Sequence, residues 1–118
     1  MKHTPLAIFG TSSHAGKTTV TAGLCRLFAR RGLRVAPLKS QNMSLNSYAT
    51  EAGEEIARST AVQARAAKQV PTVAMNPILL KPKADDVSQL ILLGRPYADV
   101  TAADYFGSDK LQALKWQA

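Results

Sequence analysis

Hydrophobic and polar positions divide the beginning of the chain into a strand, a helix and a second strand. A short apolar run at residues 6–9 ends at Gly10 and leads into a loop of small residues. Apolar side chains then recur at helical spacing from Thr18 to Arg31, and Gly32 follows as a stop signal. Residues 33–39 predict a second strand after a short link. A strand, helix and strand in this order predict a βαβ unit with parallel strands.

The rest of the chain continues to alternate between polar and apolar stretches. Residues 40–50 are rich in Ser and Asn, lack periodicity and predict a polar loop. Four further elements are expected: a helix over 54–68, strands over 77–82 and 88–93, and a polar-capped helix over 101–115. No internal repeat or linker interrupts this pattern. We therefore predict a single α/β domain.

Composition narrows the class of protein. The 118 residues suffice for one domain with a core. No apolar run approaches the roughly 20 residues that a membrane-spanning helix needs, so we expect no membrane partner. Cys25 is the one cysteine, which excludes an internal disulfide and fits a cytoplasmic location.

The net charge of +7 indicates anionic ligands without selecting one class. The basic residues are spread along the chain, and no aromatic residues are interleaved with them as in surfaces that stack bases. We therefore expect no nucleic-acid partner. Nucleotide phosphates and an acidic substrate explain the charge at least as well, and a merely solvated basic surface remains an equal alternative.

The loop after the first strand has the features of a phosphate-binding loop. Small residues allow several N–H groups to converge on one anion, and the following helix adds its unpaired N–H groups. Lys17 can reach the outer phosphates, and the Thr18 hydroxyl can ligate Mg²⁺. Thr11 stands where the strict pattern has glycine, and the alternative is a plain serine-glycine turn. The predicted nucleotide-binding residues are Gly10, Thr11, Ser12, Ser13, His14, Ala15, Gly16, Lys17, Thr18 and Thr19.

Four stretches together resemble the N-terminal part of adenosylcobyric acid synthase. They are G-T-S-S-H-A-G-K-T-T, P-L-K-S-Q-N-M-S-L-N-S, M-N-P-I-L-L-K-P and S-Q-L-I-L-L-G, in this order. The resemblance implies a P-loop NTPase-like fold, a three-layer parallel sheet with flanking helices, here truncated. It also implies ATP- and Mg²⁺-dependent amidation of peripheral carboxylates of adenosylcobyrinic acid a,c-diamide in cobalamin biosynthesis. Ammonia from glutamine would displace the phosphate from each activated carboxylate.

The resemblance also implies roles for individual residues. Lys17 and Lys39 become the catalytic candidates, with Lys39 near the reacting carboxylate. Thr18 and Glu55 become the metal candidates, and an ordinary helix-start glutamate is the equal alternative for Glu55. The residues implied in substrate binding are Gln41, Asn42 and Asn46. Asn76 and Lys81 match the asparagine-proline and lysine-proline stretch, for which a structural role is the alternative.

The chain also departs from this family. Ala52 replaces an expected aspartate, and residues 57–60 replace a glycine-arginine-alanine-glutamine stretch. A glutaminase needs a cysteine with a histidine partner. The sequence offers Cys25, on the predicted helix after the loop, and the histidines His3 and His14. We therefore expect that this chain does not hydrolyse glutamine by that mechanism. We expect residues 1–118 to be the N-terminal part of an ATP-binding synthetase domain without the glutamine amidotransferase domain, with a homo-oligomer as one assembly. The alternatives are a stand-alone P-loop module and a dethiobiotin synthetase-like enzyme.

Overall fold

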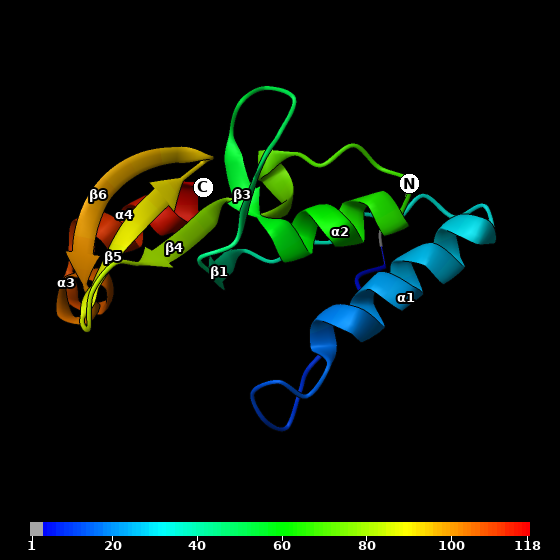
Figure 1. Cartoon of the computed structure of the whole chain (residues 1–118), viewed down its shortest axis with the longest axis horizontal. Helices are drawn as coiled ribbons and strands as arrows, with labels where there is room; N and C mark the ends of the chain where they lie inside the picture. Colours follow the sequence, from blue (N-terminus) through cyan, green and yellow to red (C-terminus); the bar gives the residue numbers. More distant parts are fainter. Residues whose placement is uncertain (1–3) are drawn as a thin grey trace.

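The computed structural model describes residues 4–118, so His3 lies outside the described residues. The strands of the described chain come in two consecutive groups, one between the first two α-helices and one before the last two (Figure 1). The elements are α1 (Lys17–Arg30), β1 (Gln41–Met43), β2 (Ser47–Ala49), β3 (Glu55–Ala57), α2 (Arg58–Ala66), a 3-10 turn (Val73–Met75), β4 (Ile78–Pro82), β5 (Val87–Leu92), β6 (Arg95–Thr101), α3 (Ala102–Gly107) and α4 (Asp109–Gln117).

The main sheet is mixed and holds four strands in the order β1-β4-β5-β6. β1 runs parallel to β4 with Asn42 opposite Leu79, whereas β4, β5 and β6 are antiparallel neighbours. A second, two-stranded sheet pairs β2 with β3. Within residues 4–118, one strand pair is therefore parallel, and the fully parallel sheet that we predicted is not formed.

The hydrophobic core lies on both faces of β4 and β5. Successive side chains of a strand point to opposite faces, and both strands are apolar at successive positions. One face carries Leu79 and Ile91 and packs against Ala57, at the end of β3. The other face packs against α3 and α4, through a cluster formed by Ile78, Leu80, Leu90, Val100, Tyr105 and Leu111.

Helices α1 and α2 form the other side of the molecule (Figure 1). The Gln63 side chain of α2 donates a hydrogen bond to the Thr18 carbonyl at the beginning of α1, at 3.2 Å. Cys25 is the buried residue of α1, and several of its apolar neighbours along the helix, including Val20 and Leu27, remain exposed. This pairing places the beginning of α1 next to α2.

The predicted strands over 6–9 and 33–39 are not strands in the structure. A strand exists only with a hydrogen-bonded neighbour, and neither segment pairs within the two sheets. Phe9 is 89% exposed and Leu38 is 73% exposed. The predicted βαβ unit is therefore wrong for the described residues, although helix α1 agrees with the prediction to within one residue at each end.

Three other element predictions need correction. The predicted loop over 40–50 contains β1 and β2, and the predicted helix over 54–68 begins only at Arg58, after strand β3. The sequence analysis missed β6, which contains Pro96 and is exposed along most of its length. The last predicted helix is two helices divided at Ser108, and Thr101 caps the first of them through a reciprocal bond pattern with Asp104.

Candidate functional site

The loop of residues 10–16 leads directly into α1 and projects from the body of the molecule (Figure 1). His14 has a φ of 57° and Gly16 a φ of 95°, both in the left-handed region. Where left-handed and right-handed residues follow one another, the N–H groups of a loop can turn toward one point and form a concave site for an anion. All loop residues are exposed, so a ligand can approach the loop from solvent.

The Lys17 side chain lies across the backbone of Gly10. A Cβ atom placed on Gly10 would lie 2.9 Å from Lys17 Nζ and 3.1 Å from its Cγ and Cδ atoms. The absence of a side chain at residue 10 therefore makes the space that the lysine occupies. This arrangement keeps the ammonium group of Lys17 at the loop that precedes its own helix.

The N-terminal end of α1 is free to bind an anion. Its cap residue, Gly16, makes no side-chain capping bond, and the first turn holds no acidic residue. The helical hydrogen bonds begin with the Val20 N–H group donating to the Gly16 carbonyl at 3.0 Å. The N–H groups before Val20 therefore point out of the helix, at the positive end of its dipole. Together with Lys17, they fit the phosphates of a nucleotide.

Lys39 is anchored by its backbone and exposes its side chain. Its N–H group donates to the Met75 carbonyl at 2.9 Å, and its carbonyl accepts a bond from Asn76 Nδ2 at 2.9 Å. The ammonium group is therefore available to a ligand. The hydrogen bonds of the described residues do not join Lys39 to the phosphate loop, so its nearness to a bound phosphate remains a prediction.

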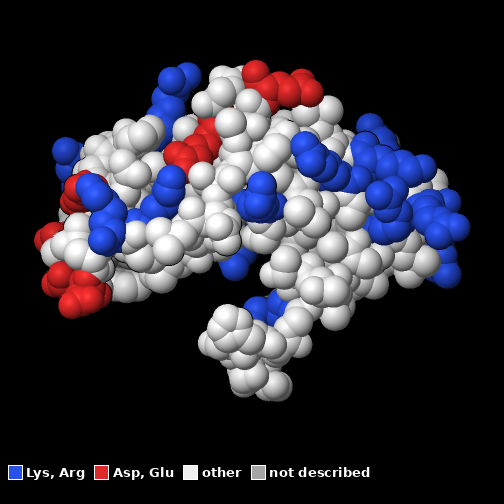
Figure 2. All heavy atoms as spheres, viewed as in Figure 1, with Lys and Arg blue, Asp and Glu red and all other residues white. Residues whose placement is uncertain are grey.

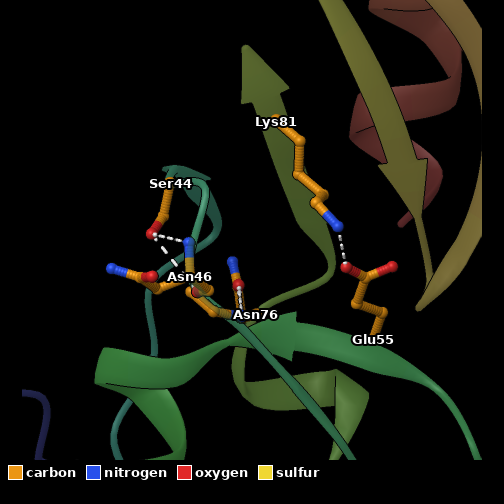
Figure 3. Close-up of polar contacts among 6 residues, drawn as sticks. Ser44, Asn46, Glu55, Asn76 and Lys81 are labelled. Carbon is orange, nitrogen blue, oxygen red and sulfur yellow. Dashed lines mark hydrogen bonds and ion pairs between the residues drawn. The ribbon is translucent and has the colours of Figure 1, made fainter. Parts of the chain in front are cut away.

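The three predicted substrate residues all contact other parts of the protein. Gln41 accepts a hydrogen bond from the Tyr105 hydroxyl at 2.6 Å. Asn42 is 4% exposed and donates to Ser59 Oγ at 3.3 Å. The Asn46 N–H group donates to Ser44 Oγ at 3.1 Å (Figure 3). Gln41 also lines a surface cavity of about 260 Å³. Gln41 and Asn46 are exposed, whereas Asn42 is part of the interior.

Glu55 is engaged with Lys81 rather than with Thr18. The Lys81 ammonium lies 2.5 Å from Glu55 Oε1, and both side chains are about one-quarter exposed (Figure 3). Burial raises the pKa of this carboxyl, but hydrogen bonds from Lys81 and Ser47 and the charge of Lys81 outweigh it and lower the pKa overall. Glu55 lies on β3, whereas Thr18 lies in the first turn of α1, directly after the phosphate loop.

The predicted metal pair is therefore not brought together. Within residues 4–118, no group of three or more His, Cys, Asp or Glu side chains is placed to hold a metal ion. Thr18 contributes one exposed hydroxyl next to the phosphate loop, which fits a metal that takes most of its ligands from phosphate and water. Glu55 would have to break its ion pair with Lys81 before it could bind a metal ion.

The chain matches a known family along most of its length. Residues 6–112 match the family described as the CobQ/CobB/MinD/ParA nucleotide binding domain. The chain belongs to this family. The predicted fold class, an α/β protein of the P-loop type, is confirmed by this membership. Both the family description and the geometry of the loop indicate nucleotide binding.

Curated relatives extend the comparison within this nucleotide-binding family. A probable cobyric acid synthase of Methanoregula boonei is 59% identical over 102 residues, which are 86% of this chain and 21% of the relative. Cobyric acid synthase of Sorangium cellulosum is 61% identical over 97 residues, which are 82% of this chain and 19% of the relative. Cobyric acid synthase of Desulforudis audaxviator is 60% identical over 110 residues, which are 92% of this chain and 22% of the relative. The predicted resemblance is confirmed, and the chain spans about one-fifth of the length of these relatives.

No solved structure matches this member of the family. No helix within the described residues is long and apolar enough to cross a membrane.

The sequence analysis missed the residues that hold the predicted site residues in place. Tyr105 contacts Gln41 across 64 positions of sequence, and Ser59 contacts Asn42 across 17. Such contacts carry no local signal, because hydroxyl groups at these positions are compatible with any polar surface. Asn76 was noticed through the asparagine-proline stretch, but its partners could be found only from the structure.

Proposed function

We propose that this chain binds MgATP through residues 10–19 and serves the ATP-dependent amidation of carboxylates of adenosylcobyrinic acid a,c-diamide. The product of this reaction class is adenosylcobyric acid. The observation that carries the proposal is the placement of Lys17 across Gly10 at the uncapped beginning of α1. The names of the relatives support the proposal, since those proteins are called cobyric acid synthases, one of them a probable one.

The chain's own residues would act mainly by binding and charge. ATP supplies the phosphoryl group that makes a carboxylate reactive, and Mg²⁺ neutralises part of its charge. The N–H groups of the loop and of the first turn of α1 hold the phosphate oxygens. Lys17 places a positive charge against the outer phosphates, and the Thr18 hydroxyl is the ligand that this chain offers to Mg²⁺. Reactions of this kind depend on positioning and electrostatics rather than on a covalent nucleophile.

Lys39 and Gln41 are proposed to face the corrinoid. The ammonium group of Lys39 would offset the charge of the carboxylate under activation. Gln41, next to its open cavity, would contact polar groups at the edge of the substrate. Ammonia then attacks the activated carboxyl carbon, phosphate leaves, and a proton is lost to give the neutral amide.

The ammonia is proposed to come from glutamine hydrolysed outside this chain. Cys25 is the one cysteine, it is buried, and burial raises the pKa of its thiol. A nucleophilic cysteine needs the opposite environment, one that favours the thiolate. Cys25 is therefore a packing residue of α1 in this proposal.

The test is nucleotide and corrinoid binding by the purified chain. Lys17→Ala should weaken MgATP binding by at least tenfold, about 1.4 kcal/mol, while circular dichroism stays unchanged because Lys17 is exposed. Lys110→Ala removes an equally exposed lysine elsewhere and should leave affinity unchanged. Equal affinities for MgATP in the unchanged protein, Lys17→Ala and Lys110→Ala would refute the proposal that residues 10–19 bind the nucleotide. Binding of diaminopelargonic acid without binding of the corrinoid diamide would instead favour the dethiobiotin synthetase-like alternative.

A further inference from the structure

Asn76 connects three segments of the chain through one buried side chain. The residue is 1% exposed. Its Oδ1 atom accepts a hydrogen bond from the Ala57 N–H group at 2.9 Å. Its Nδ2 atom donates to the Lys39 carbonyl at 2.9 Å and to the Ile78 carbonyl at 3.0 Å. Both amide hydrogens and the amide oxygen are therefore in use, which no other side chain of this size achieves.

These bonds hold Lys39 against the beginning of β4. The Lys39 N–H group donates to the Met75 carbonyl at 2.9 Å, and the Ile78 N–H group donates to the Ser40 carbonyl at 3.1 Å. Both backbone groups of Lys39 are thus bound to residues 75–76, and its side chain remains exposed. This attachment fixes the backbone position from which the Lys39 side chain extends.

The bond to Ala57 extends the attachment toward the phosphate loop. Ala57 is the residue immediately before α2. From α2, the Gln63 side chain donates to the Thr18 carbonyl at 3.2 Å, within the first turn of α1. A continuous path of hydrogen bonds and helix therefore runs from Lys39 through Asn76 and α2 to Thr18.

We propose that Asn76 is a positioning residue that fixes Lys39 relative to α2 and, through α2, relative to the phosphate loop. The role of Lys39 in this statement rests on the proposed function, whereas the attachment of Lys39 to α2 does not. An isosteric carboxylate at residue 76 would still accept the bond from Ala57. As a carboxylate it could not donate to the Lys39 and Ile78 carbonyls, and in the protonated form it could donate to only one of them. At least one bond of this attachment is then lost, and the Lys39–Met75 bond holds the segment with less support, while the bond to Ala57 is kept.

The experiment measures amide hydrogen exchange by NMR in the unchanged protein and in Asn76→Asp. The Lys39 amide should exchange at least tenfold faster in the variant, while the Ala57 amide and the amides of β5 change less than threefold. Thr60→Val is the matched control, because Thr60 is fully buried on α2 and its hydroxyl makes no hydrogen bond in the described residues. In that control no amide should change by more than threefold. Equal acceleration of all amides, or an unchanged Lys39 amide, would overturn the proposal.

A second readout links the positioning to the ligand. In the unchanged protein, saturating MgATP should slow acetylation of Lys39 by acetic anhydride at least fivefold relative to Lys110. In Asn76→Asp this protection should fall below twofold, with MgATP affinity within twofold of the original. Retained protection overturns the positioning role. Absence of MgATP binding in the unchanged protein contradicts the proposed function alone, and the exchange data still decide on Asn76.

If Asn76→Asp does not fold, the unchanged protein provides the test. The segments that hold the Lys39 and Ala57 amides should then open in the same local unfolding event. Their exchange rates, corrected for intrinsic chemistry, should agree within threefold at each concentration of added denaturant. Openings that separate with denaturant would show that Asn76 does not couple the two segments, and would overturn the proposal.

Discussion

Gly10 is the residue whose lack of a side chain decides the geometry of the phosphate loop. An added Cβ would lie 2.9 Å from Lys17 Nζ, so the lysine would have to leave its place over the loop. The flexible lysine can move without disturbing the core. The effect of a substitution should therefore fall on ligand binding and not on folding.

Gly10→Ala should weaken MgATP binding by about tenfold, which corresponds to about 1.4 kcal/mol. Its unfolding free energy should change by less than about 0.5 kcal/mol, as for other exposed positions. Gly23→Ala is the control, because a Cβ on Gly23 within α1 meets nothing within 4 Å. That variant should gain up to about 1 kcal/mol of stability from helix propensity and bind MgATP normally. Isothermal titration and urea unfolding measure both quantities, and a normal affinity in Gly10→Ala would contradict the argument.

Glu55 should make stability depend on pH in a defined direction. Its pKa is lowered in the folded protein, where hydrogen bonds from Lys81 and Ser47 outweigh the opposing effect of burial. In the unfolded chain the carboxyl titrates near its ordinary value of about 4.3. The stabilisation is therefore complete above that value and is lost as pH falls through the lowered pKa of the folded state.

Glu55→Gln should lower the unfolding free energy by about 1 kcal/mol at pH 7, the upper end for a partly exposed pair. The difference from the unchanged protein should shrink as pH falls from 5 to 3. Asp99→Asn is the control, since the Asp99–Lys83 pair is about half exposed and should contribute less than about 0.5 kcal/mol. Urea unfolding across this pH range is the measurement. A difference that grows toward acid pH would reverse the sign of the argument.

At the scale of elements, the sequence predicts those helices and strands that depend on local pattern, and it fails for strands that depend on a distant partner. Helix α1 and strands β4 and β5 follow from apolar spacing and turn residues, and the structure places them within about two residues of the prediction. Strand β6 exists because β5 offers it a partner along its whole length. The segments 6–9 and 33–39 have strand-like patterns without a partner. A sequence pattern shows which residues can form a strand, but not whether a neighbouring strand is there.

The candidate site divides in the same way. The phosphate loop could be predicted because its chemistry depends on consecutive residues, from Gly10 to Thr19. The pairing of Glu55 with Lys81 and the role of Asn76 join residues that are 26 and 19 to 37 positions apart. No local spacing records such contacts. The predicted metal role of Glu55 depended on a resemblance alone, and the ion pair with Lys81 is what the fold adds to it.

Gly94 connects the two sheets and provides a test at this scale. Its φ is +77°, and an added Cβ would lie 2.4 Å from Glu54 Cβ and 3.0 Å from the Glu55 backbone nitrogen. The Glu55 N–H group also donates to the Gly94 carbonyl at 2.8 Å. The turn between β5 and β6 thus packs directly against the beginning of β3, with no room for a side chain.

Gly94→Ala should therefore lower the unfolding free energy by at least about 2 kcal/mol, through backbone strain and overpacking together. Gly53→Ala is a close control, because Gly53 has a nearly equal φ of +76° and open space where its Cβ would lie. That variant should lose only the strain of the left-handed conformation, about 1 kcal/mol. Similar losses in the two variants, measured by urea unfolding, would show that the contact with β3 does not matter.

At the scale of the whole molecule, charge and apolar surface are unevenly distributed. Lys and Arg side chains gather over the end of the molecule where α1 and α2 end, and acidic side chains lie mainly at other places (Figure 2). The apolar side chains of the unpaired segments are exposed, among them Leu6, Phe9, Leu33 and Leu38. These residues contribute little to folding, because they remain in contact with water in the folded chain. Exposed apolar groups of this kind favour association.

The isolated chain should consequently self-associate as its concentration rises, and the unpaired segments should be responsible. Phe9→Ser combined with Leu38→Ser should shift the sedimentation coefficient distribution toward the monomer while the unfolding free energy changes by less than about 0.5 kcal/mol. Val62→Ser removes an apolar side chain that is 52% exposed on α2 and should leave association unchanged. Leu79→Ala, at a fully buried position, should cost about 2–5 kcal/mol, which confirms that the unfolding measurement responds to core packing. If the double variant loses comparable stability, residues 6–9 and 33–39 are packed in solution, and the account of them as unpaired segments is wrong.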